Sequence, residues 1–450
     1  MTYYLDIQQF GYMELFLIIL MSLKYLFGFG WDSAFIRFYN QKNENKYSVA
    51  SSTLISRLVL HLLLLVIFFF LSENILIILR IDVDYINVVW IILFIYILED
   101  YFKFLILILR SENLAKSFGI FRIYQIVLQF ILLVSFFVFL ELNIHAVFYS
   151  LFLTNIIILL FIIIKYKKFI FLKQKINFYV NIKKLFAYGF PLLFVAIAFF
   201  VINYSDRYML RFLLEDKIAL QEIGLYSFYN KIASSCLMFL VVFRMIWMPL
   251  VLKNYHDLNY KKVFRYIIVF CATISLSASL FVSLFSFEIL NIFSGDKIYL
   301  LKYNVLSLVF IIQLLILLGD YTSIGIHIMK KTTYSALFGF LFAIINIFLN
   351  YFLIPIYMLE GAIIASILSL LGYIVATNIL SYKLYKLNFN FYHFLIGLIL
   401  LSGMYFFSTI ELTYKFYVLL FLILLFSFYI KINFANFKFC FLILKKDKVL

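Results

Sequence analysis

The chain carries one apolar run after another, and most of these runs are long enough to cross a lipid bilayer as a helix. Spanning the hydrocarbon core takes about 20 predominantly apolar residues. Thirteen stretches come close to this length: 11–36, 55–76, 87–109, 123–140, 145–164, 188–206, 224–250, 266–290, 303–328, 335–355, 361–382, 392–409 and 416–430. Charged residues make up only 13% of the 450 residues, so polar atoms cannot cover this surface in water. We therefore expect an all-α, polytopic helical membrane protein and exclude a soluble enzyme.

Lysine and arginine are unevenly divided between alternate connections of these runs. One set of connections holds 26 of the 38 basic residues, the other set holds 6, and the last 6 lie within the runs. Basic residues near helix ends collect on the cytoplasmic side of a membrane. We therefore expect the visible amino terminus outside and the carboxyl terminus in the cytoplasm. The net charge of +16 then orients the chain and does not indicate binding to nucleic acid.

An outside amino terminus ordinarily follows an exported leader, and residues 1–10 lack the basic region and cleavage site of one. We therefore expect an intact architecture of fourteen helices, with one helix upstream of the thirteen that are visible.

The longest polar connection, 165–189, carries seven lysines and marks the joint between two lobes. The expected division is an N-terminal transmembrane lobe (1–164), a basic cytoplasmic inter-lobe linker (165–187), a C-terminal transmembrane lobe (188–390), and a terminal helix pair with a basic tail (391–450).

Cysteine and histidine show no spacing typical of a disulfide framework or a metal site. The residues concerned are Cys236, Cys271, Cys440, His61, His145, His256, His327 and His393. We expect no metal or other cofactor.

Six basic residues fall inside the predicted spans, where each needs a cavity or a partner. They are Lys24, Arg57, Lys103, Lys231, Arg244 and Lys302. Arg57 and Lys302 lie near helix ends, so their side chains can extend to the interface. Lys103 follows Glu99 and Asp100 by four and three residues, so the three can neutralise one another on one face.

Lys24 and Lys231 have no acidic neighbour at helical spacing. In a water-filled cavity two such cations would bind an anionic group such as a diphosphate. Arg244, one turn before Trp247, is a further candidate. A purely structural role for all three stays open.

Asp320 and His327 are two turns apart on one face of the span 303–328. A buried carboxylate there could exchange a proton during transport, which makes the two residues candidates for ion coupling. A packing pair within the bundle is the alternative.

Proline is scarce, so its three positions mark intended breaks. Pro191 is expected to open a helix after Gly189, Pro249 to close one, and Pro355 to end one shortly before Gly361.

Several motifs together resemble the Wzx-type polysaccharide flippases, which share a superfamily with the multidrug and toxin extruders and the lipid II flippases. The matching residues are Gly11, Tyr12, 33–39, 188–191, 203–208, 223–227, Lys231, Trp247, Pro249, Asn346, Asn350, 353–355 and 361–366. The resemblance covers nearly the whole chain, and the stretch from Asp206 to Lys231 is its most specific part.

This resemblance implies two pseudo-symmetric helical lobes around a central cavity, with an additional carboxyl-terminal helix pair. It implies a non-enzymatic flippase that moves undecaprenyl-diphosphate-linked oligosaccharide repeat units across the inner membrane, for O-antigen, capsule or a related glycan. Polymerase and glycosyltransferases of the same pathway are the implied partners, besides membrane lipids.

The expected roles follow from the resemblance and from the unpaired charges together. Substrate binding is expected at Lys24, Lys231, Arg37, Arg207 and Arg244, of which Lys231, Arg37 and Arg207 match recurrent family positions. Structural or gating roles are expected at Asp206, Pro191, Trp247 and Pro249. The alternatives are a cation-coupled multidrug exporter and a membrane glycan polymerase or ligase.

Overall fold

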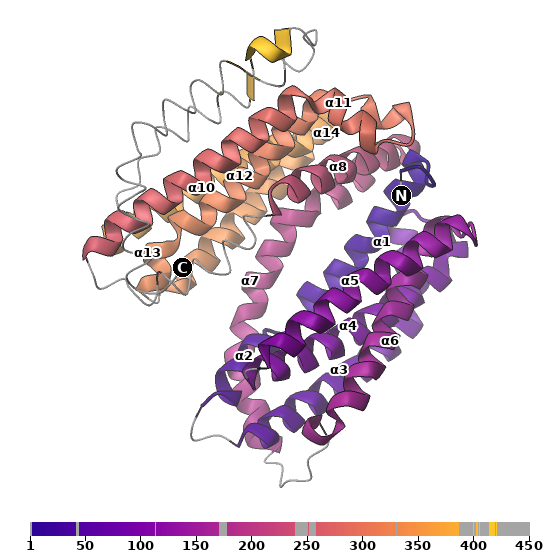
Figure 1. The fold of residues 1–450 in the computed structure, drawn as a ribbon, viewed down its shortest axis with the longest axis vertical. Helices are drawn as coiled ribbons and strands as arrows, with labels where there is room; N and C mark the ends of the chain where they lie inside the picture. Colours follow the sequence, from indigo (N-terminus) through magenta and orange to yellow (C-terminus); the bar gives the residue numbers. More distant parts are fainter. Residues whose placement is uncertain are drawn as a thin grey trace. The chain divides into compact units, whose positions relative to one another are not determined.

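The computed structural model describes residues 2–41, 45–112, 114–170, 178–238, 251, 258–329 and 331–386, with a few residues between 399 and 420. Throughout these ranges the regular structure is helical, and no β-strand occurs in them (Figure 1). The all-α fold expected from the apolar runs is thereby confirmed.

The chain forms two compact units, one over Tyr3–Gln221 and the other over Glu222–Leu450. This agrees with the expected two-lobed architecture. Helix α7 (Phe178–Leu213), which follows the basic connection, packs with the first unit, against α1 (Ile7–Leu26), α2 (Trp31–Tyr39) and α3 (Lys46–Ile78). The finer division predicted around a 165–187 linker stays a prediction, because residues 171–177 lie outside the described part.

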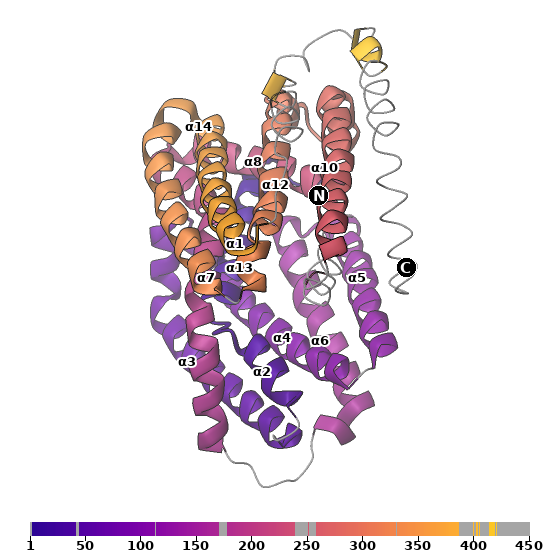
Figure 2. The same ribbon diagram turned by 90° about the vertical axis from the view of Figure 1, so that its left-hand side faces the viewer.

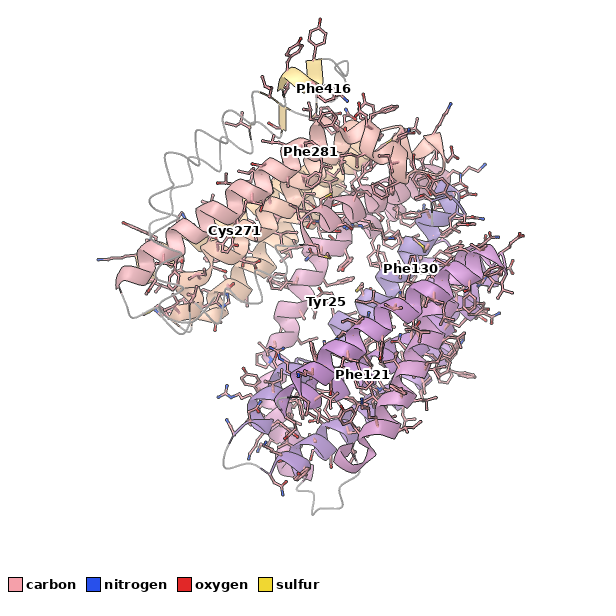
Figure 3. All side chains as sticks on the ribbon, in the orientation of Figure 1. Tyr25, Phe121, Phe130, Cys271, Phe281 and Phe416 are labelled. Atoms are coloured by element: carbon pink, nitrogen blue, oxygen red, sulfur yellow. The ribbon has the colours of Figure 1, made fainter. Side chains whose placement is uncertain are left out.

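The first unit is a bundle with a long central helix. Its helices are α1 (Ile7–Leu26), α2 (Trp31–Tyr39), α3 (Lys46–Ile78), η1 (Val83–Tyr85), α4 (Ile86–Ser111), α5 (Ala115–Val138), α6 (Asn143–Ile170) and α7 (Phe178–Leu213). Helix α4 packs against α1, α3, α5 and α6. Phe121 of α5 joins the buried core, whereas Phe130 on the same helix is 66% exposed, as a lipid-facing side chain would be (Figure 3).

Two helix starts in this unit have conventional caps. The Asp6 side chain accepts from the Gln9 amide, and the Gln9 side chain accepts from the Asp6 amide, which forms a capping box for α1. The Asn45 side chain accepts from the amides of Tyr47 and Ser48 at the start of α3. The polar residues that precede the apolar runs therefore fix where these helices begin.

The single span expected over 11–36 is wrong, because the chain breaks between α1 and α2. Phe29 and Gly30 have φ of 45° and 61° there. The broken segment lies directly on the backbone of α7: a Cβ on Gly189 would stand 2.3 Å from the Phe29 carbonyl oxygen. Gly189 and Gly30 thus allow two backbones to meet where side chains would separate them.

The expected helix opening at Pro191 is also wrong. Helix α7 runs from Phe178 to Leu213 with Pro191 inside it. The helix continues on both sides of the proline, next to the close approach at Gly189.

The second unit contains α8 (Asp216–Cys236, which starts in the first unit), α10 (Leu258–Leu284), α11 (Ser286–Phe293), η2 (Lys297–Leu300), η3 (Tyr303–Val305), α12 (Leu306–Thr322), α13 (Ile324–Ile328) and α14 (Thr332–Tyr385). Helix α12 packs against α10 and α14.

Helix α14 contains both spans expected at 335–355 and 361–382. It folds back on itself (Figure 2), and the break is at Met358, with φ of 50° and ψ of −122°. The helix therefore continues three residues beyond Pro355, so its expected end at that proline is displaced. Asn346 donates to the Ser366 hydroxyl across the fold, at 3.2 Å.

Seven helical segments in the described ranges are long and apolar enough to cross a membrane: α1, α3, α5, α6, α7, the stretch Tyr303–Ile328, and α14. The pair Thr273–Leu284 and Ser286–Phe293, bent by 78°, would add an eighth. Helix α4 is less uniformly apolar because Glu99, Asp100 and Lys103 occupy its middle. The two terminal spans expected at 392–409 and 416–430 lie largely outside the described residues.

Candidate functional site

The first unit encloses a polar cavity of about 300 Å³. Its walls come from the carboxyl end of α1, the start of α2, the middle of α4 and the amino-terminal part of α5. The lining residues are Lys24, Gly28, Asp32, Tyr96, Glu99, Asp100, Phe102, Lys103, Arg122 and Gln125. Ionisable groups in the middle of apolar helices face a water-filled space or pair with one another, and here they do both.

Two lysines of the cavity are paired with carboxylates from other helices. Lys24 of α1 forms an ion pair with Glu99 of α4, and Lys103 of α4 forms one with Asp32 of α2. The lysine side chains remain 33% and 57% exposed. Both ammonium groups are therefore held in place and still accessible from the cavity.

Arg57 of α3 joins two of the cavity's carboxylates from within the bundle. Its side chain is 2% exposed and pairs with Asp32 at 2.5 Å and with Asp100. The His61 Nε2 lies 3.4 Å from the other Asp100 oxygen. The expectation that Arg57 extends to the interface is wrong, because its charge is compensated by partners in the interior.

Arg122 is held at the opposite wall. Its guanidinium lies over the Phe102 ring at 5.0 Å from the centroid and donates to Gln125 Oε1 at 3.2 Å. Gln125 in turn donates to Asn155 Oδ1 of α6 at 3.2 Å. These contacts fix the direction of the arginine, and its guanidinium also interacts electrostatically with Glu99 of the same cavity.

The charges that line the cavity balance, because Lys24, Lys103 and Arg122 stand against Asp32, Glu99 and Asp100. Arg57 adds a fourth cation beside the cavity, where its buried side chain pairs with Asp32 and Asp100. Lysine and arginine bind phosphate oxygens through charge-assisted hydrogen bonds, and an incoming phosphate would replace the carboxylates on the two accessible lysines.

The sequence builds this site through two local features. Tyr96, Glu99, Asp100 and Lys103 follow the spacing of one helical face, so α4 presents them together. The break after α1 turns the chain so that Asp32 lines the same cavity as these α4 residues. The α4 spacing is readable in the sequence, whereas the break and the partners on other helices are not.

The structure brings one of the predicted substrate-binding residues, Lys24, into this cavity. Arg37 is exposed on α2, with its guanidinium 4.6 Å from the Tyr188 ring centroid. Arg207 is buried and donates to the Asn203 carbonyl oxygen at 2.6 Å. Lys231 lies half-buried on α8, in the second unit. The binding roles of these residues stay predictions.

Three further predicted residues, Asp206, Asp320 and His327, do not line the cavity. Asp320 of α12 and His327 of α13 are half-buried in the second unit, and Asp206 is buried on α7. Arg244, Trp247 and Pro249 lie outside the described residues.

A second charged cluster lies in the second unit. Lys302 Nζ is 3.0 Å from both the Glu222 and the Glu360 carboxylates. Glu222 is 5% exposed, so it depends on this lysine for compensation. The cluster joins the start of α8, the segment before α12 and the turn of α14, which indicates a structural role. Lys302, like Arg57, was expected to extend outward and instead is paired.

Comparison with known proteins agrees with this architecture. Residues 1–255 match the family described as polysaccharide biosynthesis protein. No curated protein matches the chain significantly.

Solved transporters share the fold. The lipid II flippase MurJ in an inward closed conformation superposes with a TM-score of 0.74 at 14% identity, over 97% of this chain and 95% of that chain. An outward-facing multidrug resistance MATE family transporter of the MOP superfamily superposes with a TM-score of 0.58 at 15% identity, over 89% of each chain. A MOP superfamily transporter from Pyrococcus furiosus superposes with a TM-score of 0.57 at 16% identity, over 88% of this chain and 87% of that chain. At such identities the likeness concerns the fold.

Proposed function

The chain belongs to the polysaccharide biosynthesis protein family, and from this membership we propose that it is a flippase of the cytoplasmic (inner) membrane. Its substrate is an oligosaccharide repeat unit on undecaprenyl diphosphate, which it moves from the cytoplasmic to the periplasmic leaflet by alternating access. The glycan serves a surface polysaccharide such as O-antigen or capsule. Transport of this kind requires binding and release, and no covalent bond is made or broken.

The observation that carries this proposal is the polar cavity of the first unit, which is lined by two accessible lysines and an arginine. A diphosphate is the charged part of the substrate and must leave water to cross the bilayer. Lys24 and Lys103 offer accessible ammonium groups, and Arg122 offers a guanidinium at the opposite wall. Several cations at one site compensate a diphosphate better than one would.

The proposal is tested by complementation of a bacterial strain that lacks its own repeat-unit flippase. The intact chain should restore surface polysaccharide. Lys24→Ala should lower that recovery severalfold, while Lys116→Ala, which removes an exposed lysine on α5, should leave it unchanged. Lys231→Ala tests the predicted second binding lysine in the same strain. Full recovery with both Lys24→Ala and Lys231→Ala would contradict a diphosphate clamp.

A cation-coupled multidrug exporter is the second candidate. Its specific support is the set of three carboxylates in the same cavity, because cationic drugs bind carboxylates. These carboxylates belong to Asp32, Glu99 and Asp100. Efflux of ethidium from cells that express the chain tests it. Efflux that is lost in Glu99→Gln, without any recovery of polysaccharide, would favour the exporter over the flippase.

A further inference from the structure

One face of α7 carries aromatic side chains at every fourth residue. Phe200, Tyr204, Tyr208 and Phe212 follow this spacing, and Tyr25 of α1 lies against the first two. We call these five residues the aromatic row. At 1.5 Å per residue, the four rings on α7 extend over about 18 Å along the helix.

The aromatic row contains two stacked pairs of rings, and the contacts between the pairs and with Tyr25 are tilted. Phe200 and Tyr204 are stacked with centroids 5.6 Å apart and planes 24° apart, and Tyr208 and Phe212 are stacked at 6.4 Å and 17°. Tyr25, labelled in Figure 3, lies 5.9 Å from Phe200 and 6.1 Å from Tyr204. The aromatic row therefore brings five rings into contact with one another along α7 and α1.

The aromatic row is neither core nor a purely lipid-facing stripe. Tyr25, Phe200, Tyr204 and Tyr208 are half-buried, and Phe212 is 40% exposed. Further along α7 towards its amino end, Phe190 and Phe194 are 39% and 53% exposed and have no polar atom, which suits contact with lipid chains. Three of the five rings in the row carry hydroxyl groups instead, and such a mixture suits a ligand that is itself both apolar and polar.

The aromatic row adjoins the cation cavity through α1. Lys24 pairs with Glu99 at the cavity, and the next residue, Tyr25, turns its ring to α7. Lys103 of the cavity also interacts electrostatically with Tyr25. The Tyr208 hydroxyl and the Ser22 hydroxyl share a hydrogen bond of 3.0 Å, which fixes the row to α1.

We infer that the aromatic row binds the sugar rings of the substrate while the neighbouring cations hold its diphosphate. This inference rests on the proposed function and assigns the glycan part of that substrate to a site. A pyranose presents an apolar face of C–H groups to an aromatic ring and hydroxyl groups at its edge, and tyrosine matches both features. In the undecaprenyl-linked substrate the first sugar is bonded directly to the diphosphate, so the glycan site must adjoin the phosphate site.

The full chain in detergent is titrated with undecaprenyl diphosphate and with undecaprenyl diphosphate that carries a tetrasaccharide. The difference between the two affinities is the contribution of the sugar. The variants are Phe200→Ala, Tyr204→Ala and Tyr204→Phe, with Phe194→Ala as the matched control on the same helix.

We expect the wild-type chain to bind the glycosylated lipid more tightly. Phe200→Ala and Tyr204→Ala should each weaken the binding of the glycosylated lipid by about tenfold, which corresponds to about 1.4 kcal/mol. Tyr204→Phe, which keeps the aromatic ring, should lose less affinity for the glycosylated lipid than Tyr204→Ala does. Binding of the lipid without sugar should be equal in all variants, which also shows that they remain folded, and Phe194→Ala should match the wild type with both probes.

Equal weakening of both probes would assign the row to the prenyl chain and overturn the inference. Equal affinity of the wild-type chain for the two lipids would also overturn the inference. That result would leave the proposed transport of a lipid diphosphate uncontradicted. Failure of the wild-type chain to bind either lipid would instead contradict the proposed function itself.

Discussion

Lys24 at the carboxyl end of α1 and Glu99 in the middle of α4 form an ion pair at the wall of the polar cavity. The pair holds a lysine in place within an apolar bundle while its side chain stays 33% exposed. It also means that an anionic ligand must compete with a carboxylate that is already in place.

Glu99→Gln should therefore tighten the binding of inorganic pyrophosphate by about three- to tenfold, because the competing charge is removed. Lys24→Ala should weaken binding by a similar factor. Calorimetric titration of the purified full chain at low ionic strength measures both. Glu112→Gln is the control, since Glu112 pairs with Lys46 away from the cavity. An unchanged affinity in Glu99→Gln would show that the pair does not compete with anions.

Arg57→Ala should lower the free energy of unfolding by about 3 to 5 kcal/mol, because Asp32 and Asp100 would lose the buried cation that compensates them. Thermal unfolding in detergent checks this. Arg37→Ala serves as the control, because Arg37 is exposed and its guanidinium lies over the Tyr188 ring. A shift in Arg57→Ala no larger than that in Arg37→Ala would contradict the prediction.

Gly189→Ala should destabilise the first unit and disturb the break between α1 and α2, because the new Cβ would stand 2.3 Å from the Phe29 carbonyl oxygen. The matched control is Gly119→Ala on α5, whose Cβ would meet no atom within 4 Å. That control should be neutral or up to about 1 kcal/mol stabilising, since alanine is the better helix former. Unfolding midpoints of the two variants in one detergent decide between these outcomes, and equal midpoints would disprove the close approach.

Lys302→Ala should lower the stability of the second unit by about 3 kcal/mol, because Glu222 would remain buried beside Glu360 without a cation. Lys297→Ala, at an exposed lysine of η2, should have no measurable effect. Limited proteolysis at rising temperature compares the two variants. The prediction fails if both resist the protease equally.

The fold was predictable because apolar run length and the asymmetry of basic residues are local properties of the sequence. The same locality explains the errors. The break at Phe29 and Gly30 lies within an apolar run that has no proline, so the run reads as one helix over 11–36. Conversely, Pro191 reads as a helix start, although α7 continues through it.

The candidate site was predictable in part. Lys24 was identified because a lysine in an apolar span needs an explanation, and it does line the cavity. Its partner Glu99 could not be found, because the pair joins two different helices. Lys103 was expected to pair along α4, and instead it reaches Asp32 of α2. Arg122 lies just outside the expected span 123–140, and it lines the cavity because α5 already begins at Ala115.

The partners of the charge network appear in a fixed order during synthesis. Lys24 and Asp32 leave the ribosome first, Arg57 and His61 follow on α3, and Glu99, Asp100 and Lys103 come last on α4. Lys24 and Asp32 are therefore made before any of the groups that pair with them. The ion pairs of the cavity form only once all four helices from α1 to α4 have been synthesised.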